Sequence, residues 1–402
     1  MVAALVFVFT YVAFSVGRVP GLRSDRTGAA IIGAALMLGF RELTLTEAQA
    51  QIDGATIALL FGMMVLSAAL EVSGAFALIG YWVMRRARTP MAMMLGVGVT
   101  SAVLSAFLIN DVVCIAFTPL VLHICEALDC DPKPHLLALA TGSNIGSVAT
   151  ITGNPQNILI ASLSHISYGR FALALRPIAA LSLALNIGVL WLVHRRTLAI
   201  PFNEARERPR PRVYARWVWK GGLVSGAVLI AFIAGAQPAI AALIGASFML
   251  LTRAVNPKRL YTRVDWSLLA LFVGLFVVVA GVERVGLAGR LLAMLEPLHP
   301  ENAWGLTVVA AVLSNVVSNV PAVMLLKSLV PHLPHPESAW LTLAMASTLA
   351  GNLTLPGSLA TIIVVERAKS RSKISFLDFL KVGLPSALLS LAVGASWLAW
   401  VH

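Results

Sequence analysis

Two short polar runs interrupt long apolar stretches of this sequence and could bind an ion or a small solute. One contains Asn110 and Asp111, and the other contains Ser318 and Asn319. Such side chains are costly in lipid, so they should face protein or a watery cavity. We predict that Asn110, Ser318 and Asn319 bind substrate, and that Asp111 ligates or carries the coupling ion. The alternative role of Asp111 is to cap the half-helix that follows it.

Glycine, proline and amide residues occur together in two further runs, residues 141–157 and 347–361. Glycine allows a tight turn and proline removes a backbone donor, so we expect a helix to break in each run and then resume. An unwound point offers carbonyl oxygens to a cation and a half-helix N-terminus to an anion. Such polar residues can also simply join neighbouring membrane helices. The predicted substrate ligands are Asn144, Asn154, Asn157, Thr348, Asn352, Ser358 and Thr361, and the predicted ion-coupling positions are Gly153 and Gly357.

Lys327 lies in the apolar run that follows Asn319. Its ammonium group could stand in for a bound cation or attract an anion, so we include it among the ion-coupling candidates. It could equally extend to the membrane interface. The three cysteines and eight histidines show no metal-type spacing, and no nucleotide-binding motif occurs. We therefore expect inert thiols, no metal and no cofactor, with Na⁺ or H⁺ as the possible coupling ion.

The polar runs belong to a weak internal repeat. Residues recur in order between 53–158 and 265–362, with an offset that falls from 212 to 209 to 204. Matched pairs include Asp53 with Asp265, Gly62 with Gly274, Asn110 with Asn319, and Gly153 with Gly357. A duplication with Gly/Pro-broken hydrophobic segments at matching places is typical of secondary transporters.

The composition indicates a polytopic membrane protein. Of 402 residues, 58% are hydrophobic and only 12% are charged, whereas a soluble domain carries about 25% charged residues. Uncharged stretches at 1–17, 91–110, 221–252 and 382–401 are long enough for spanning helices. We expect the first to be a retained helix rather than a signal peptide. The predicted fold is all-α, with about 10 membrane-spanning helices, broken helices and two re-entrant hairpins in inverted repeats.

The net charge of +12 is carried largely by basic residues in short loops. An excess of Lys and Arg marks the cytoplasmic side of a membrane protein, and this placement argues against nucleic-acid binding. The threading that follows starts the first repeat outside at Asp53 and the second inside at Asp265, so the repeats are inverted. The predicted segments are N-terminal scaffold helices (1–50), a first inverted repeat (51–193), a cytoplasmic basic linker (194–220), a scaffold helical hairpin (221–263), and a second inverted repeat with the C-terminal helix (264–402).

Three motifs resemble those of known ion transporters. Residues 109–111 with 117–121 resemble the first hairpin of the arsenite-pump and citrate-transporter superfamily. Residues 153–157 resemble the Gly-x-Pro-x-Asn loop of sodium-coupled dicarboxylate and sulfate symporters. Residues 318–321 with 357–361 are similar to the second half of arsenite efflux permeases. The likeness covers most of the chain from about Gly17 onward, and is closest to the bacterial "anion transporter" branch.

This resemblance implies a scaffold domain and a transport domain that carries two re-entrant hairpins, in a homodimer that works as an elevator in a bacterial inner membrane. In the symporters, Ser-Asn-Thr at the hairpin tips meets the substrate carboxylate and sodium. Here only the second tip keeps Ser-Asn, at Ser318 and Asn319, and neither tip keeps the Thr. This departure argues against sodium–dicarboxylate symport.

The leading functional hypothesis is therefore a secondary carrier for a small anion or oxyanion, coupled to H⁺ or Na⁺. One alternative is a proton-exchanging efflux carrier for metalloid hydroxides such as arsenite or silicic acid. Another is a Na⁺/H⁺ antiporter, although Asp111 is the only acid at the four breaks. A channel is the alternative from a different class, and the absence of hydrolase motifs argues against an enzyme.

Overall fold

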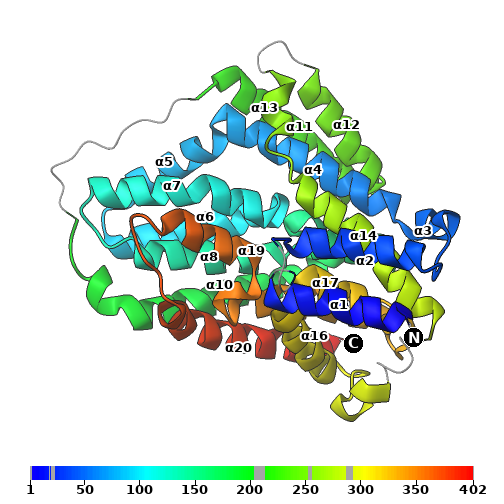
Figure 1. Cartoon of the computed structure of the whole chain (residues 1–402). Coiled ribbons are helices and arrows are strands. Elements are labelled where there is room, and N and C mark those ends of the chain that lie inside the picture. Colours follow the sequence, from blue (N-terminus) through cyan, green and yellow to red (C-terminus); the bar gives the residue numbers. More distant parts are fainter. Residues whose placement is uncertain are drawn as a thin grey trace.

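The computed structural model describes residues 2–17, 19, 23–202, 213–251, 256–286 and 293–401. Within these ranges the chain forms helices and no β-strand, which confirms the predicted all-α class (Figure 1). The centre of the predicted linker, residues 203–212, lies outside the described ranges.

The described residues of the first half form ten helices. They are α1 (Val2–Val16), α2 (Arg26–Gly39), α3 (Leu45–Gln51), α4 (Gly54–Ser73), α5 (Ala75–Arg86), α6 (Pro90–Phe107), α7 (Asn110–Ala127), α8 (Lys133–Ser147), α9 (Pro155–Ser164) and α10 (Tyr168–Leu198). A 3₁₀ turn, Ile151–Gly153, lies between α8 and α9.

The described helices of the second half follow a similar order. They are α11 (Ala215–Ile233), α12 (Pro238–Leu250), α13 (Pro257–Tyr261), α14 (Trp266–Arg284), α16 (Ala303–Val317), α17 (Asn319–Leu326), α18 (Pro336–Leu349), α19 (Leu359–Ala368) and α20 (Phe376–Val401). The 3₁₀ turns are Glu296–Leu298, Val330–His332, Ala350–Asn352 and Leu355–Gly357.

Seven helices are long and apolar enough to cross a membrane: α4, α6, α7, α10, α11, α14 and α20. The helices α1, α2, α12 and α16 are apolar but shorter. The pairs α6/α7 and α16/α17 are each joined by only one or two non-helical residues, at the polar runs around Asn110 and Ser318. If each of these pairs is a hairpin and each of α8/α9 and α18/α19 is one broken crossing, the described helices match the expected number of about ten crossings.

The helix breaks are shorter than the sequence predicts. Residues 141–147 belong to α8, so Asn144 lies on a regular helix rather than in an unwound segment. The first break is confined to residues 148–154, and it ends where the Asn154 side chain accepts a 2.8 Å hydrogen bond from the backbone N–H of Asn157. Pro155 then occupies the first turn of α9, where its missing N–H costs nothing. Glycines at 142 and 146 do not break α8, because they serve its packing against α6 instead.

Helices of the two halves pack on each other in matching pairs. Helix α4 lies against α12, and α14 lies against α2 (Figure 1). A Cβ atom on Gly62 would lie 2.7 Å from the backbone carbon of Ala242, and one on Gly274 would lie 2.7 Å from that of Ala30. Gly62 and Gly274 are 212 residues apart, as are Ala30 and Ala242. The offset that relates α4 to α14 therefore also relates their partners, α2 and α12. The sequence analysis assigned both of these partner helices to the scaffold.

We expect Gly62→Ala to lower the thermal stability of the purified protein, because the new methyl group would overlap the backbone of α12. Gly188→Ala is the matched control, since Gly188 is also helical but has no atom within 4 Å of the added methyl group. It should be neutral or stabilising by about 0.5–1 kcal/mol. The two melting temperatures in the same detergent provide the comparison, and equal values would contradict the close packing.

Ion pairs between the ends of helices agree with the predicted threading. Arg371 Nη1 lies 2.8 Å from Glu126 Oε2, and Arg284 Nη1 lies 2.8 Å from Glu47 Oε2. The threading places both members of the first pair inside and both members of the second pair outside. Arg263 likewise pairs with Glu71, both assigned to the inner side.

Candidate functional site

The two polar runs meet at one cavity of about 550 Å³. It is lined by Asn110 and Asp111 from the first hairpin, and by Ser318 and Asn319 from the second. Segments that are about two hundred residues apart in the sequence thus come together at one site. The other lining residues that carry polar side chains are Ser15, Asp25, Arg26, Thr27, Gln156, Asp265, Ser267 and Ser358.

Four helices begin at this cavity. Their first residues, Asn110 of α7, Pro155 of α9, Asn319 of α17 and Leu359 of α19, all line it. The first turn of a helix has backbone N–H groups without helical partners and a partial positive charge. The hairpin tips and the breaks therefore direct four helix N-termini toward the cavity.

The amide of Asn144 joins the two halves beneath the cavity. Its Oδ1 accepts hydrogen bonds from Asn110 Nδ2 at 3.1 Å and from Ser358 Oγ at 2.9 Å. Its Nδ2 donates to Asn352 Oδ1 at 2.8 Å and to Thr361 Oγ1 at 3.4 Å. Five of the predicted substrate ligands thus form one network, and two of them, Asn110 and Ser358, reach the cavity wall.

Thr348 is the centre of a second network. Asn154 Nδ2 donates to its hydroxyl at 3.0 Å, and Gln156 Nε2 donates to the same oxygen at 3.2 Å. Asn157 Nδ2 donates to the carbonyl oxygens of Ser147 and Thr150, each at 3.0 Å. Asn154, Asn157 and Thr348 are buried and do not line the cavity, so in this conformation they hold the break together.

Gln156 and Asn315 are candidate site residues that the sequence analysis did not select. Gln156 lines the cavity from the first turn of α9. Asn315 Nδ2 donates to the carbonyl oxygen of Ala350 at 2.8 Å, and its Oδ1 accepts from Thr354 Oγ1 at 2.8 Å. Asn315 therefore ties the second hairpin to the second break. Both residues were visible in the sequence as amides within the polar runs.

Each hairpin tip contains a hydrogen-bond acceptor that has no partner among the described residues. Asn110 Oδ1 and Asn319 Oδ1 are buried and accept no hydrogen bond within the described part of the chain. The orientation of the Asn110 amide follows from its donation to Asn144. Ser318 has φ +78°, a conformation that L-residues rarely adopt and that concentrates at functional sites. The second tip is therefore strained, and each tip holds a buried acceptor oxygen without a partner among the described residues.

Asp111 is the free carboxylate of this cavity. It makes no hydrogen bond or ion pair with any residue that the structure describes. Asp25 and Asp265 also line the cavity, but they cap α2 and α14 by accepting from the backbone N–H groups of Gly28 and Leu268, each at 2.9 Å. Asp111 is thus available to a ligand or a proton, and the capping role is not observed for it.

The two ion-coupling glycines, Gly153 and Gly357, lie in tightly packed turns. A Cβ atom on Gly153 would overlap the carbonyl of Ser147, and one on Gly357 would lie 2.8 Å from Asn315 Oδ1. Both positions therefore require glycine for packing, and their role in ion binding stays a prediction.

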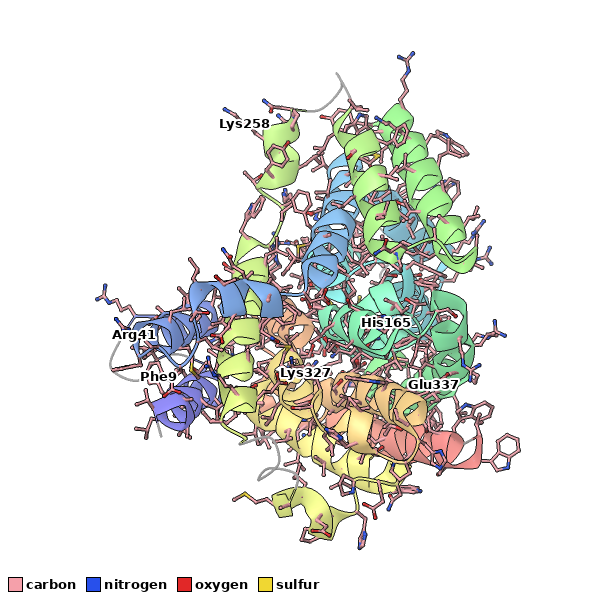
Figure 2. All side chains as sticks on the ribbon, turned by 90° about the vertical axis from the view of Figure 1, so that its right-hand side faces the viewer. Phe9, Arg41, His165, Lys258, Lys327 and Glu337 are labelled. Carbon is pink, nitrogen blue, oxygen red and sulfur yellow. The ribbon has the colours of Figure 1, made fainter. Side chains whose placement is uncertain are left out.

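Lys327, labelled in Figure 2, lies at the end of α17 and does not line the cavity. Its Nζ is 3.3 Å from Glu283 Oε1, and its side chain is only 14% exposed. The ammonium group is thus neutralised by a partner from α14, which is an arrangement that neither sequence interpretation anticipated.

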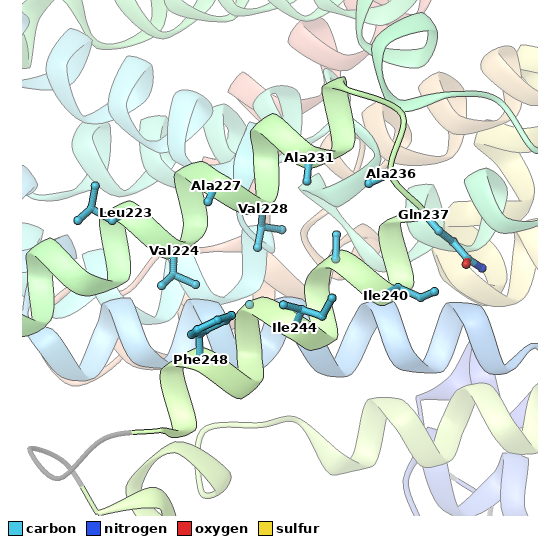
Figure 3. Close-up of a pocket in the computed structure, with 12 residues that line it drawn as sticks. Leu223, Val224, Ala227, Val228, Ala231, Ala236, Gln237, Ile240, Ile244 and Phe248 are labelled. Atoms are coloured by element: carbon cyan, nitrogen blue, oxygen red, sulfur yellow. The ribbon is translucent and has the colours of Figure 1, made fainter.

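A separate groove of about 520 Å³ lies between α11 and α12 (Figure 3). Its lining is apolar except for Gln237, with side chains such as Leu223, Val228, Ile244 and Phe248. This groove has no charged group with which to bind an ion, so the cavity at the hairpin tips is the better candidate site.

Comparison with known proteins identifies the family of this chain. A family model described as "Citrate transporter" matches residues 9–350. The chain belongs to the citrate transporter family. It is 30% identical to the silicon efflux transporter LSI3 of Oryza sativa subsp. japonica, across 94% of this chain and 93% of that protein. It is 28% identical to a 46 kDa membrane protein of Mycobacterium leprae, across 100% of this chain and 98% of that protein.

The fold of this citrate transporter family member is also known from a solved structure. The YdaH transporter of Alcanivorax borkumensis matches with a TM-score of 0.59 at 15% sequence identity, across 100% of this chain and 98% of that one. The resemblance to the citrate-transporter superfamily that was drawn from the motifs is therefore confirmed, and the chain is a membrane transporter.

We expect Ser358→Ala to weaken transport by roughly tenfold to a hundredfold, because it removes the hydroxyl that donates to Asn144 Oδ1 at the cavity wall. A buried polar group that loses its partner costs about 1–3 kcal/mol. Asn154→Ala should have an effect of the same size through the break that it caps. Ser386→Ala is the matched control, since Ser386 Oγ also donates to an asparagine oxygen, Asn186 Oδ1 at 2.8 Å, away from the cavity. Concentration-dependent uptake into proteoliposomes measures the effect, and wild-type affinity in Ser358→Ala would argue against this wall of the site.

Proposed function

We propose that this transporter moves a small hydroxylated oxyacid, of the type of silicic acid, out of the cell in exchange for protons. The observation that carries the proposal is the set of unpaired acceptors at the hairpin tips, Asn110 Oδ1, Asn319 Oδ1 and the carboxylate of Asp111. A neutral metalloid hydroxide presents several O–H donors that match such acceptors. A fully ionised oxyanion presents acceptors only.

The charges of the cavity support the same choice. Among the described residues, Asp25, Asp111 and Asp265 line it together with a single basic residue, Arg26. The Arg26 Nε already donates to the carbonyl oxygen of Phe14 at 3.2 Å. A polyanion such as citrate would meet more negative than positive charge there, and like charges in a partly desolvated site repel strongly. The silicon efflux function named for the rice relative agrees with a neutral oxyacid.

A singly charged anion is the second candidate, and the four helix N-termini at the cavity favour it. Each end could donate backbone N–H groups to one oxygen of the anion. This candidate corresponds to the leading hypothesis from the sequence, and it differs from the first only in the charge of the cargo. A Na⁺/H⁺ antiporter ranks below both, because Asp111 is the only acid among the described lining residues that is not already a helix cap.

We assign the coupling step to Asp111. Its carboxylate has no hydrogen-bond or ion-pair partner among the described residues. The matching position of the second repeat is Val320, so Asp111 has no titratable counterpart there. A proton taken up from one side would be released on the other as the site changes access. Sodium coupling would instead use the carboxylate and the tip amide oxygens as ligands.

We also propose that the hairpins and broken helices move as one elevator relative to α4, α14 and the helices packed on them. The networks around Asn144 and Thr348 support this division, because they bind the hairpins and breaks of both halves into one unit. A homodimer in a bacterial inner membrane is part of the proposal. Its support is the family resemblance and the bacterial relative.

Proton-driven efflux from proteoliposomes tests the proposed cargo. Vesicles loaded with germanic acid, a neutral analogue of silicic acid, should release germanium faster when the outside is made acidic, as measured by elemental analysis. Citrate and sulfate should not compete with this release. Transport of a monovalent anion by vesicles that show no germanium flux would favour the second candidate instead. Rates beyond carrier turnover would indicate a channel.

A further inference from the structure

Two thiols and an imidazole gather at one end of the first hairpin, away from the cavity already described. Cys125 lies in the last turn of α7, Cys130 in the connection that follows, and His135 in the first turn of α8. One ligand atom from each of these residues lies within 4.8 Å of the others. Four residues separate Cys125 from Cys130, and four separate Cys130 from His135. The first interval is within the range of structural zinc sites, although the sequence analysis predicted no metal there.

The end of α7 explains why the two thiols meet. Asp129 has φ +51°, and the backbone N–H of Cys130 donates to the carbonyl oxygen of Cys125 at 3.0 Å. The N–H of Asp129 donates to the carbonyl oxygen of Glu126 at 3.4 Å. This is a Schellman motif, in which the residues at the positions of Cys125 and Cys130 contact each other. The contact is apolar in most proteins, whereas here both partners can bind a metal.

His135 provides an independent indication of a ligand. Its side chain is 1% exposed, and its Nδ1 has no hydrogen-bond partner within the described chain. A buried imidazole nitrogen without a partner is energetically costly unless an ion or another polar group binds to it. A cavity of about 600 Å³ adjoins the cluster and is lined by Cys125, Cys130 and Asp131, among others.

We propose that Cys125, Cys130 and His135 bind a thiophilic divalent metal ion, Zn²⁺ in the first instance, at the junction of α7 and α8. A tetrahedral zinc site places its ligand atoms roughly 3.5 Å apart, so the cluster closes with shifts of about 1 Å. Each thiol loses its proton as the metal binds. A water molecule from the adjoining cavity would complete the coordination.

The surroundings favour a metal over a disulfide. The predicted topology places this junction on the cytoplasmic side, next to the loop of Arg371, whose side chain pairs with Glu126. Thiols on that side stay reduced in most organisms. Because α8 leads from His135 to Asn144, a metal at the junction would fix the helix that carries the central amide of the transport site. The proposal does not depend on which cargo is transported.

Cobalt binding to the full-length protein tests this site. The protein is purified in detergent with a reductant, stripped of metal, freed of the reductant under anaerobic conditions and titrated with Co²⁺. We expect one Co²⁺ per chain, with an intense thiolate-to-cobalt band in the near ultraviolet and the visible bands of tetrahedral cobalt. Zn²⁺ should displace the cobalt and remove both sets of bands.

Three variants make the test specific. Cys130→Ser and His135→Gln should lose or weaken the bands, whereas Cys114→Ser should keep them, since Cys114 is a buried thiol of the same helix outside the cluster. Alkylation of the metal-free protein should label Cys125 and Cys130, and Zn²⁺ should protect them. No stoichiometric band in the wild-type protein, an unchanged band in Cys130→Ser, or a Cys125–Cys130 disulfide that persists in the reduced preparation would each overturn the proposal.

Discussion

Asp111→Asn is expected to abolish net uphill transport while leaving substrate exchange across the membrane. The substitution keeps the size of the side chain and its hydrogen-bonding capacity, but it removes the charge and the titration. Exchange requires no net movement of the coupling ion, so it should continue. The measurement compares pH-driven accumulation with counterflow in the same proteoliposomes. The wild-type rate should depend on pH if protons are the coupling ion, and on sodium if Asp111 ligates Na⁺.

The repeat provides the control for this experiment. Val320 occupies the position that matches Asp111, and it also lines the cavity. Val320→Ala changes the volume at the second tip without touching a titratable group, so coupling should remain intact. Full accumulation by Asp111→Asn would remove the proposed mechanism. The Lys327–Glu283 pair would then be the next group to test.

Asn144→Ala is expected to abolish both net transport and exchange and to lower the thermal stability. The substitution removes the four hydrogen bonds that connect Asn144 to Asn110, Ser358, Asn352 and Thr361. A buried polar group left without a partner costs about 1–3 kcal/mol, and several partners are affected together. Because Asn144 lies beneath the cavity wall, it acts by positioning Asn110 and Ser358.

Asn186→Ala separates this positioning from general destabilisation. Asn186 is fully buried in α10, donates to Thr141 Oγ1 at 2.9 Å and accepts from Ser386, but it does not reach the cavity. Its loss should lower the melting temperature and leave substrate affinity close to that of the wild type. Thermal shift with and without substrate measures both effects, since a ligand stabilises the protein that binds it. Equal loss of transport in the two variants would argue against a special role for Asn144.

The sequence predicted the class of fold well because hydrophobic length and charge placement act over whole helices. The all-α architecture and the family resemblance are confirmed. The convergence of Asn110 with Ser318 followed from the internal repeat and its inverted threading, and the structure places both at one cavity. These predictions depend on patterns that repeat along the chain, so local errors had little effect on them.

Pairings between side chains were much harder to predict. Nothing in the sequence shows that Asn144 would contact residues more than two hundred positions away, or that Lys327 would be neutralised by Glu283. The extent of α8 was also misjudged, because glycine permits a break but also permits close helix packing, and only the neighbouring helix decides between them. The meeting of Cys125 and Cys130 depends on Asp129, which follows the helix C-cap Leu128 and adopts a positive φ without being glycine.

The reciprocal packing of α4 on α12 and of α14 on α2 has a consequence for the synthesis of this protein. When the first half leaves the ribosome and enters the membrane, the close-packing surface at Gly62 has no partner, because that partner is the backbone of Ala242. The surface at Ala30 likewise has no packing partner until Gly274 has been synthesised. Each half therefore completes its helix packing only against the other half. Two separately expressed halves should reach the mature structure only when they are made in the same cell.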